Sequence, residues 1–202
     1  EVKETFVKRS KIITAVRNYM NGKDFVEVET PILNTVASGA NARPFVTHHN
    51  TLDIDMFMRI APELYIKRLI VGGFDRVYEL GRMFRNEGMD IKHNPEFTMM
   101  ELYQAYANLE DMMVIAEEAF TAARKAIGLG ETITYQGKAI NLASPWQRLT
   151  MIDAIKKYVG IDYSGMTAEQ AVSAALAAGV EKISVRGVMQ YTKLSIKKSK
   201  SN

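Results

Sequence analysis

The chain of 202 residues contains no cysteine, which excludes disulfides, thiolate metal ligands and cysteine nucleophiles. It has no run of roughly 18 apolar residues, the length that a membrane-spanning helix needs. Residues 1–4, EVKE, lack the basic and then apolar pattern of a secretion signal. Apolar residues make up 47% and charged residues 24%, so the composition is that of an ordinary globular domain. We therefore expect a soluble, cytoplasmic domain with no membrane partner.

Positive charge is in excess only at the C-terminal end. Residues 193–202 hold four lysines and no acid, and the rest of the chain has 22 basic against 23 acidic residues. Such a run is more typical of a solvated end than of a nucleic-acid surface. We expect one domain over residues 1–180 and a divergent or truncated basic tail over 181–202.

Apolar periodicity predicts an α+β domain built on an antiparallel sheet that is flanked by helices. Helices are expected over residues 1–20, 62–72 and 108–127, and from Thr150 and Thr167 onwards. Strands are expected over 25–29, 52–60, 77–84 and 96–106, and in a small hairpin over 133–142. Asn108 and both threonines are suited to capping the helices that they precede.

The loop of the long hairpin carries an unusual set of polar groups. Arg85 and Glu87 lie where the first strand ends, and His93 and Asn94 lie where the second begins. A guanidinium can bind phosphate, a carboxylate can accept from an exocyclic amine, and an imidazole can donate to phosphate. Phe97 offers a flat face for a purine. Each residue alone is more typical of a solvated loop or a core strand, but together they indicate a nucleotide site without a glycine-rich loop.

Glu101 lies on the second hairpin strand, on the same face as Met99 and Tyr103, because side chains alternate along a strand. A carboxylate in such surroundings costs free energy when it is buried without a cationic or donor partner. The ordinary interpretation is an ion pair with Arg82 or Arg85 on the neighbouring strand. Direct ligand binding is the alternative.

These segments resemble class II aminoacyl-tRNA synthetases in their bacterial lysyl form. The sequences FRNEG (84–88) and HNPEFTMMELYQAYA (93–107) are similar to motif 2, placed at about 77–106. The sequence DFVEVETPIL (24–33) resembles motif 1, placed at about 12–33, which forms a dimer interface in that class. The resemblance therefore implies the antiparallel catalytic fold of the class and a homodimer.

The resemblance implies a role for each residue of the hairpin site. Arg85 would be the catalytic residue, contacting the ATP α-phosphate and the carboxylate of lysine. Glu87 would read the adenine amine, and Phe97 would stack on the adenine ring. His93 and Asn94 would hold the nucleotide from the returning arm of the loop.

The resemblance also implies a lysine site. Glu63 and Glu101 would meet the two amines of lysine, one near the α-amine and the other near the side-chain ammonium. Tyr103 would assist, and Gly39 would line the pocket with its backbone. Convergent carboxylates are what a cationic substrate requires, so the residue types agree with the resemblance.

The chain departs from the family pattern after Gly137, where no glycine-rich motif 3 with a second ATP-binding arginine is found. The acidic ligands of the expected Mg²⁺ would lie in that missing half, so no metal ligand is assigned here. We expect an incomplete catalytic domain. Its leading function is that of a lysyl-tRNA synthetase portion, using ATP to form lysyl-adenylate and transferring lysine to tRNA(Lys), but not self-sufficient. The alternatives are a paralogue that transfers lysine to a protein, and a non-catalytic ATP-binding or dimerisation fragment.

Overall fold

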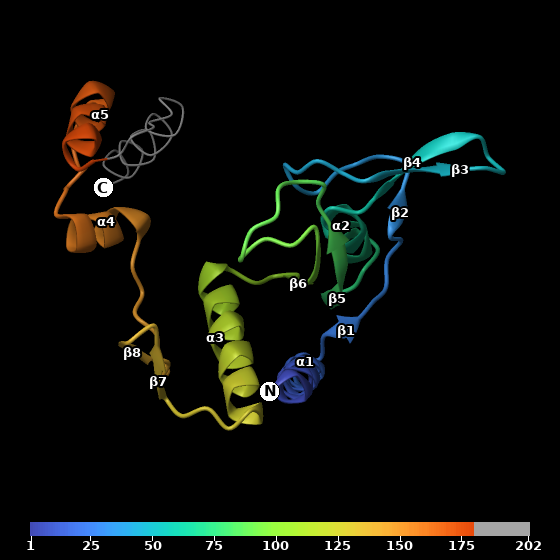
Figure 1. The fold of residues 1–202 in the computed structure, drawn as a ribbon, viewed down its shortest axis with the longest axis horizontal. Coiled ribbons are helices and arrows are strands. Elements are labelled where there is room, and N and C mark those ends of the chain that lie inside the picture. Colours follow the sequence, from blue (N-terminus) through green and yellow to red (C-terminus); the bar gives the residue numbers. More distant parts are fainter. Residues whose placement is uncertain (180–202) are drawn as a thin grey trace. The chain divides into compact units, whose positions relative to one another are not determined.

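The computed structural model describes residues 1–179, which fall into two compact units (Figure 1). The first unit is Glu1–Pro145 and the second begins at Trp146. The expected basic tail at 181–202 lies outside the described residues. None of the described helices combines the length and the apolar composition that a membrane span requires.

Helices and strands follow the expected α+β order. The helices are α1 (Val2–Gly22), α2 (Glu63–Val71), α3 (Leu109–Ala126), α4 (Met151–Val159) and α5 (Ala168–Ala177). The strands are β1 (Val26–Glu27), β2 (Leu33–Asn34), β3 (Val46–His49), β4 (Ile54–Met58), β5 (Arg76–Phe84), β6 (Glu96–Gln104), β7 (Thr132–Tyr135) and β8 (Lys138–Asn141). The expected caps are confirmed, since Asn108, Thr150 and Thr167 each accept a hydrogen bond from a backbone N–H in the first turn of their helix.

Two local expectations differ from the structure. The strand expected over 52–60 starts only at Ile54, because residues 50–53 form the turn from β3, with Asp53 at a φ of +53°. The strand expected over 25–29 is reduced to Val26–Glu27, and it runs parallel to β5 rather than antiparallel. The main sheet, in the order β1-β5-β6, is therefore mixed.

The β5–β6 hairpin is antiparallel over its full length, from the pair Arg76↔Gln104 to the pair Phe84↔Glu96. A second sheet has the order β2-β4-β3, and β7 and β8 form a separate hairpin. The long register fixes which residues of the two strands face each other. It places Glu79 directly opposite Glu101.

The two faces of the hairpin have different surroundings. Its apolar face packs against α1 and α3, which lie side by side in Figure 1. The buried centre of this core consists of Met20, Phe25, Tyr78 and Ile115, with Leu80, Met100 and Leu102 packed against it. Helix α2 contacts both hairpin strands as well. The alternation expected for β6 is thus confirmed on its core side, and Glu101 and Tyr103 occupy the alternate positions.

Candidate functional site

The loop of the β5–β6 hairpin lines an open pocket of about 340 Å³. This volume lies within the range of small-ligand sites, roughly 300–1,000 Å³. The residues that line it are Arg85, Glu87, Gly88, Lys92, His93, Asn94, Pro95 and Phe97. The structure therefore brings all five residues of the expected nucleotide site to one pocket.

Arg85 is held at the mouth of the hairpin by its backbone and by its side chain. Its N–H donates to the carbonyl of Pro95 at 2.8 Å, which continues the pairing of the two strands past the end of β5. Its guanidinium lies 5.2 Å from the centre of the Phe97 ring, within the range of a cation–π contact. A group suited to phosphate and a flat aromatic ring are thus neighbours in one pocket.

Glu87 belongs to a loop that is joined to the segment before β3. The N–H of Asn86 donates to the carbonyl of Arg43 at 2.7 Å. The N–H of Arg43 in turn donates to Oε1 of Glu87 at 3.4 Å. These two bonds limit the movement of the Glu87 carboxylate, which could then accept from an amine in the pocket.

His93 is oriented by Asp90 within the same loop. Its Nδ1 lies 2.8 Å from Oδ2 of Asp90, and the Asp90 carboxylate also accepts from the N–H groups of Lys92 and His93. Hydrogen bonding to His93 lowers the pKa of Asp90. The pair leaves Nε2 as the ring nitrogen outside this contact, available to a ligand oxygen.

Glu101 is a half-buried carboxyl group with an unsatisfied atom. Its Oε2 is buried and has no hydrogen-bond partner. Burial raises its pKa, and the negative charge of Glu63 adds to the increase, while Arg85 and Lys67 oppose it. Buried polar atoms almost always have partners, so an unpaired one marks a position for a ligand or another functional group.

The ordinary interpretation of Glu101 is wrong. Arg82 pairs with Glu96 instead, at 3.3 Å. Across the described residues, no ion pair joins Glu101 to Arg82 or to Arg85, and Arg85 acts on Glu101 only through its charge at longer range. Glu101 is therefore not part of a structural ion pair.

Glu63, Tyr103 and Gly39 lie close to Glu101 or to one another. Burial raises the pKa of Tyr103, and the charges of Glu101 and of Glu63, the first residue of α2, add to the increase. Gly39 has a φ of +91°, and a Cβ added there would lie 3.3 Å from the Cβ of Glu63. A side chain at Gly39 would strain its backbone conformation and would require the start of α2 to shift slightly.

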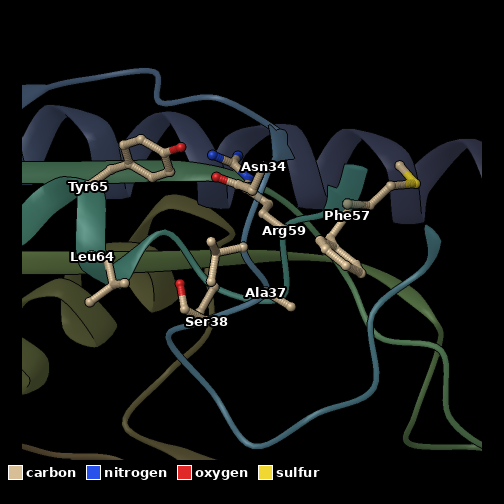
Figure 2. A pocket seen from close by; sticks show the side chains of 10 residues that line it. Asn34, Ala37, Ser38, Phe57, Arg59, Leu64 and Tyr65 are labelled. Carbon is tan, nitrogen blue, oxygen red and sulfur yellow. The ribbon is translucent and has the colours of Figure 1, made fainter. Parts of the chain in front are cut away.

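A small hollow beside Gly39 is a packing feature. Figure 2 shows Ser38 and Leu64 among the side chains around it, which come from the loop before Gly39, from β4 and from α2. Its volume of about 10 Å³ corresponds to one water molecule. The hollow is too small for an amino acid, and we assign it to the positioning of the loop.

A buried ion pair that the sequence analysis missed lies beneath the site. Arg59 and Glu79 are 5% and 2% exposed, and Nη1 of Arg59 donates to Oε1 of Glu79. Thr30 connects the two groups, because its hydroxyl donates to Glu79 at 2.6 Å and accepts from Arg59 at 3.2 Å. Nε of Arg59 donates to the carbonyl of Arg82 at 3.0 Å. The pair joins β4, β5 and the segment after β1.

The family model described as tRNA synthetases class II (D, K and N) matches residues 1–196. The chain belongs to this family. The resemblance found in its motifs is thereby confirmed, and the α+β fold is that of a class II synthetase domain.

Curated relatives are named lysine–tRNA ligase. The chain is 58% identical over 177 residues to that of Thermoanaerobacter pseudethanolicus, covering 87% of this chain and 35% of the relative. It is 56% identical over 170 residues to that of Clostridium acetobutylicum, covering 84% and 33%. It is 55% identical over 183 residues to that of Moorella thermoacetica, covering 90% and 37%. The chain thus spans about a third of the length of these synthetases.

Class II synthetases of the lysyl type use Mg²⁺ with ATP. In residues 1–179, no group of three or more His, Cys, Asp or Glu side chains is arranged to hold a metal ion. No magnesium site is therefore assigned to the described residues.

Sequence reasoning placed the hairpin residues in one pocket because they are local in the sequence, but it missed Arg59, Glu79 and Lys67. A weak signal was present for the buried pair. Glu79 is a charged residue inside the apolar run VYEL, and Arg59 follows an apolar strand directly. Two opposite charges of this kind, in two strands, can indicate mutual burial.

Proposed function

We propose that this chain forms the ATP- and lysine-binding part of a lysine–tRNA ligase, which activates lysine as lysyl-adenylate and transfers it to tRNA(Lys). The observation that carries the proposal is the position of Glu101. Its carboxylate has a buried, unpaired oxygen, and the charges of both Glu63 and Arg85 act on it. Carboxylates suited to binding amines and a guanidinium suited to binding phosphate therefore act on the same region of the chain.

In the proposed reaction, a carboxylate oxygen of lysine forms a bond to the α-phosphorus of ATP while the bond from that phosphorus to pyrophosphate breaks. Negative charge increases on the α-phosphate oxygens, and the Arg85 guanidinium stabilises it. Arg85 also contacts the attacking carboxylate, so it brings two anions together. The protein forms no covalent intermediate, and catalysis rests on positioning and charge stabilisation.

The nucleotide is oriented by the remaining residues of the hairpin pocket. Phe97 stacks on the adenine ring, and Glu87 accepts a hydrogen bond from the adenine amine. His93 and Asn94 hold the nucleotide from the returning arm of the loop. The cation–π contact between Arg85 and Phe97 keeps the phosphate end and the base end of the pocket in a fixed relation.

Lysine is selected by charge. It carries two ammonium groups, and Glu63 and Glu101 supply one carboxylate for each. Tyr103 is half-buried, and its raised pKa keeps the hydroxyl protonated and able to donate or accept a hydrogen bond. The backbone of Gly39 closes the pocket beside Glu63.

The same proposal includes a homodimer, a cytoplasmic location and Mg²⁺ bound together with ATP. Within the motif 1 segment, Val26, Ile32 and Leu33 are exposed apolar residues, as expected for a surface that a second subunit covers.

Calorimetric titration with non-hydrolysable adenylate analogues tests the proposal. The lysyl analogue should bind, and the aspartyl and asparaginyl analogues should not. Glu101→Gln should weaken the lysyl analogue, while Glu96→Gln on the same strand, which loses only an exposed pair with Arg82, should not. Equal binding of all three analogues would contradict the selection of lysine. Binding of none of them would mean that this chain by itself does not form the proposed site.

A further inference from the structure

A lysine of the chain itself lies at the proposed lysine site. Lys67 is one helical turn after Glu63 on α2, and its Nζ forms an ion pair with the Glu63 carboxylate. The same Nζ lies 5.9 Å from the centre of the Tyr103 ring. Two of the four residues assigned to free lysine therefore already contact an ammonium group.

This ammonium is chemically the same as the one on the substrate. It is a primary amine on a four-carbon stem, and hydrogen bonding to Glu63 raises its pKa, so it is charged at neutral pH. Its charge also acts on Glu101, where it lowers the pKa of the carboxyl group against the effect of burial. Without a ligand, Lys67 thus neutralises part of the negative charge that would attract lysine.

We propose that Lys67 is an internal competitor: its ammonium occupies the Glu63 carboxylate in the free protein and is displaced when lysine binds. The proposal rests on the function proposed above and adds a residue that sets its affinity. An amine of the substrate takes over Glu63, and the Lys67 side chain turns into solvent. No bond is made or broken.

The contacts of Lys67 are weak enough to be displaced. Its side chain is 52% exposed, and helical Glu–Lys pairs and exposed cation–π contacts each contribute little. Removing both contacts should tighten lysine binding by about three- to tenfold. If Lys67 instead helped to bind lysine, removing its contacts would weaken lysine binding.

The test measures L-lysine affinity by calorimetry on the full chain at one low ionic strength. Lys67→Met removes the charge, keeps the length of the side chain and suits a helix. Lys67→Arg keeps the charge and should retain the affinity of the wild type. Lys8→Met is the matched control, because Lys8 forms an equivalent exposed pair with Glu4, one turn away on α1, where no site is proposed.

The outcomes separate the two proposals. Tighter binding in Lys67→Met alone supports the competitor. Equal or weaker binding in Lys67→Met, with clear binding by the wild type, overturns the competitor and leaves the proposed function standing. Absence of binding in every variant overturns the lysine site and the competitor with it.

Chemical labelling of amines gives a second readout that does not depend on a variant. Saturating L-lysine should increase the labelling rate of Lys67 relative to that of Lys8, measured by mass spectrometry of the digested chain. Norleucine, which lacks the side-chain amine, is the comparison ligand. An unchanged ratio with bound lysine would contradict displacement.

Discussion

Replacing Arg59 by methionine should severely destabilise the first unit of the chain. Arg59 and Glu79 are almost fully buried, and Arg59 forms hydrogen bonds to Glu79, to Thr30 and to the carbonyl of Arg82. The substitution leaves the Glu79 carboxylate in the interior without its cation. Breaking a buried pair in this way costs about 3–5 kcal/mol, a large part of a typical stability of about 5–15 kcal/mol.

The control for this variant is Arg82→Met on β5, the strand that carries Glu79. Arg82 and Glu96 are each 54% exposed, and such a surface pair contributes about 1 kcal/mol at most. Urea unfolding followed by circular dichroism gives the free energy of unfolding of each variant. Hydrogen exchange of peptides from β5 and β6 shows whether the loss lies in the first unit. A loss below about 1 kcal/mol in Arg59→Met would refute the assignment of a tightly coupled buried pair.

Gly81 provides a second perturbation of the same group. A Cβ at this position would lie 2.5 Å from Nη2 of Arg59, which is too close for any contact. Because the guanidinium is fixed by its hydrogen bonds, Gly81→Ala should cost about 1–3 kcal/mol through overpacking. The effect should be smaller in an Arg59→Met background, and this non-additivity in a double-mutant cycle would identify the contact as the cause. Additive losses would mean that the glycine acts elsewhere.

The remaining predictions concern the site and its supports. Arg85→Met should weaken the lysyl-adenylate analogue by about tenfold or more in calorimetry, through loss of charge-assisted hydrogen bonds, and Arg82→Met should not. The pKa of Glu101 is raised, so on acidification its carboxylate should become protonated, and lysine affinity should begin to fall, at a pH above the ordinary carboxyl pKa of 4.5. This loss of affinity should be absent in Glu101→Gln. Because the raised pKa means that the folded chain ionises Glu101 less readily than the unfolded chain, the free energy of unfolding should fall as pH rises from about 4.5. In urea titrations, this fall of unfolding free energy with pH should be smaller in Glu101→Gln. Asn108→Ala should cost about 1 kcal/mol of unfolding free energy through loss of the α3 cap, whereas Asn141→Ala on the exposed β8 strand should cost less.

The hairpin pocket could be predicted because its residues are close in the sequence. An antiparallel hairpin brings the end of one strand beside the start of the other, so Arg85 and Phe97 are expected to lie close together once both strands are identified. Helix starts were predictable for a similar reason, since the cap at Asn108 depends on residues within one turn.

The buried ion pair, the β1–β5 pairing and the position of Lys67 depend on tertiary contacts, which the periodicity of the sequence does not encode. Arg59, Glu79 and Thr30 meet across separations of 20 to 49 residues. The parallel pairing of β1 with β5 depends on the long connection through β2, β3, β4 and α2. Because β1 is only two residues long, this pairing could not be predicted from the sequence. Lys67 was overlooked because a lysine four residues after a glutamate is ordinarily a solvated helix pair.

The register of β5 and β6 explains why the proposed role of Glu101 depends on the buried pair. Glu79 and Glu101 are directly opposite each other, and like charges in that arrangement are destabilising. Arg59 neutralises Glu79, so only Glu101 remains without a close cation, and its negative charge is available to a cationic ligand. Without Arg59, the charge of Glu79 would act on Glu101 unopposed and favour its protonated form, which cannot pair with an ammonium. Two glutamates in equivalent strand positions thus acquire different roles, one structural and one suited to binding, from the single arginine that reaches only one of them.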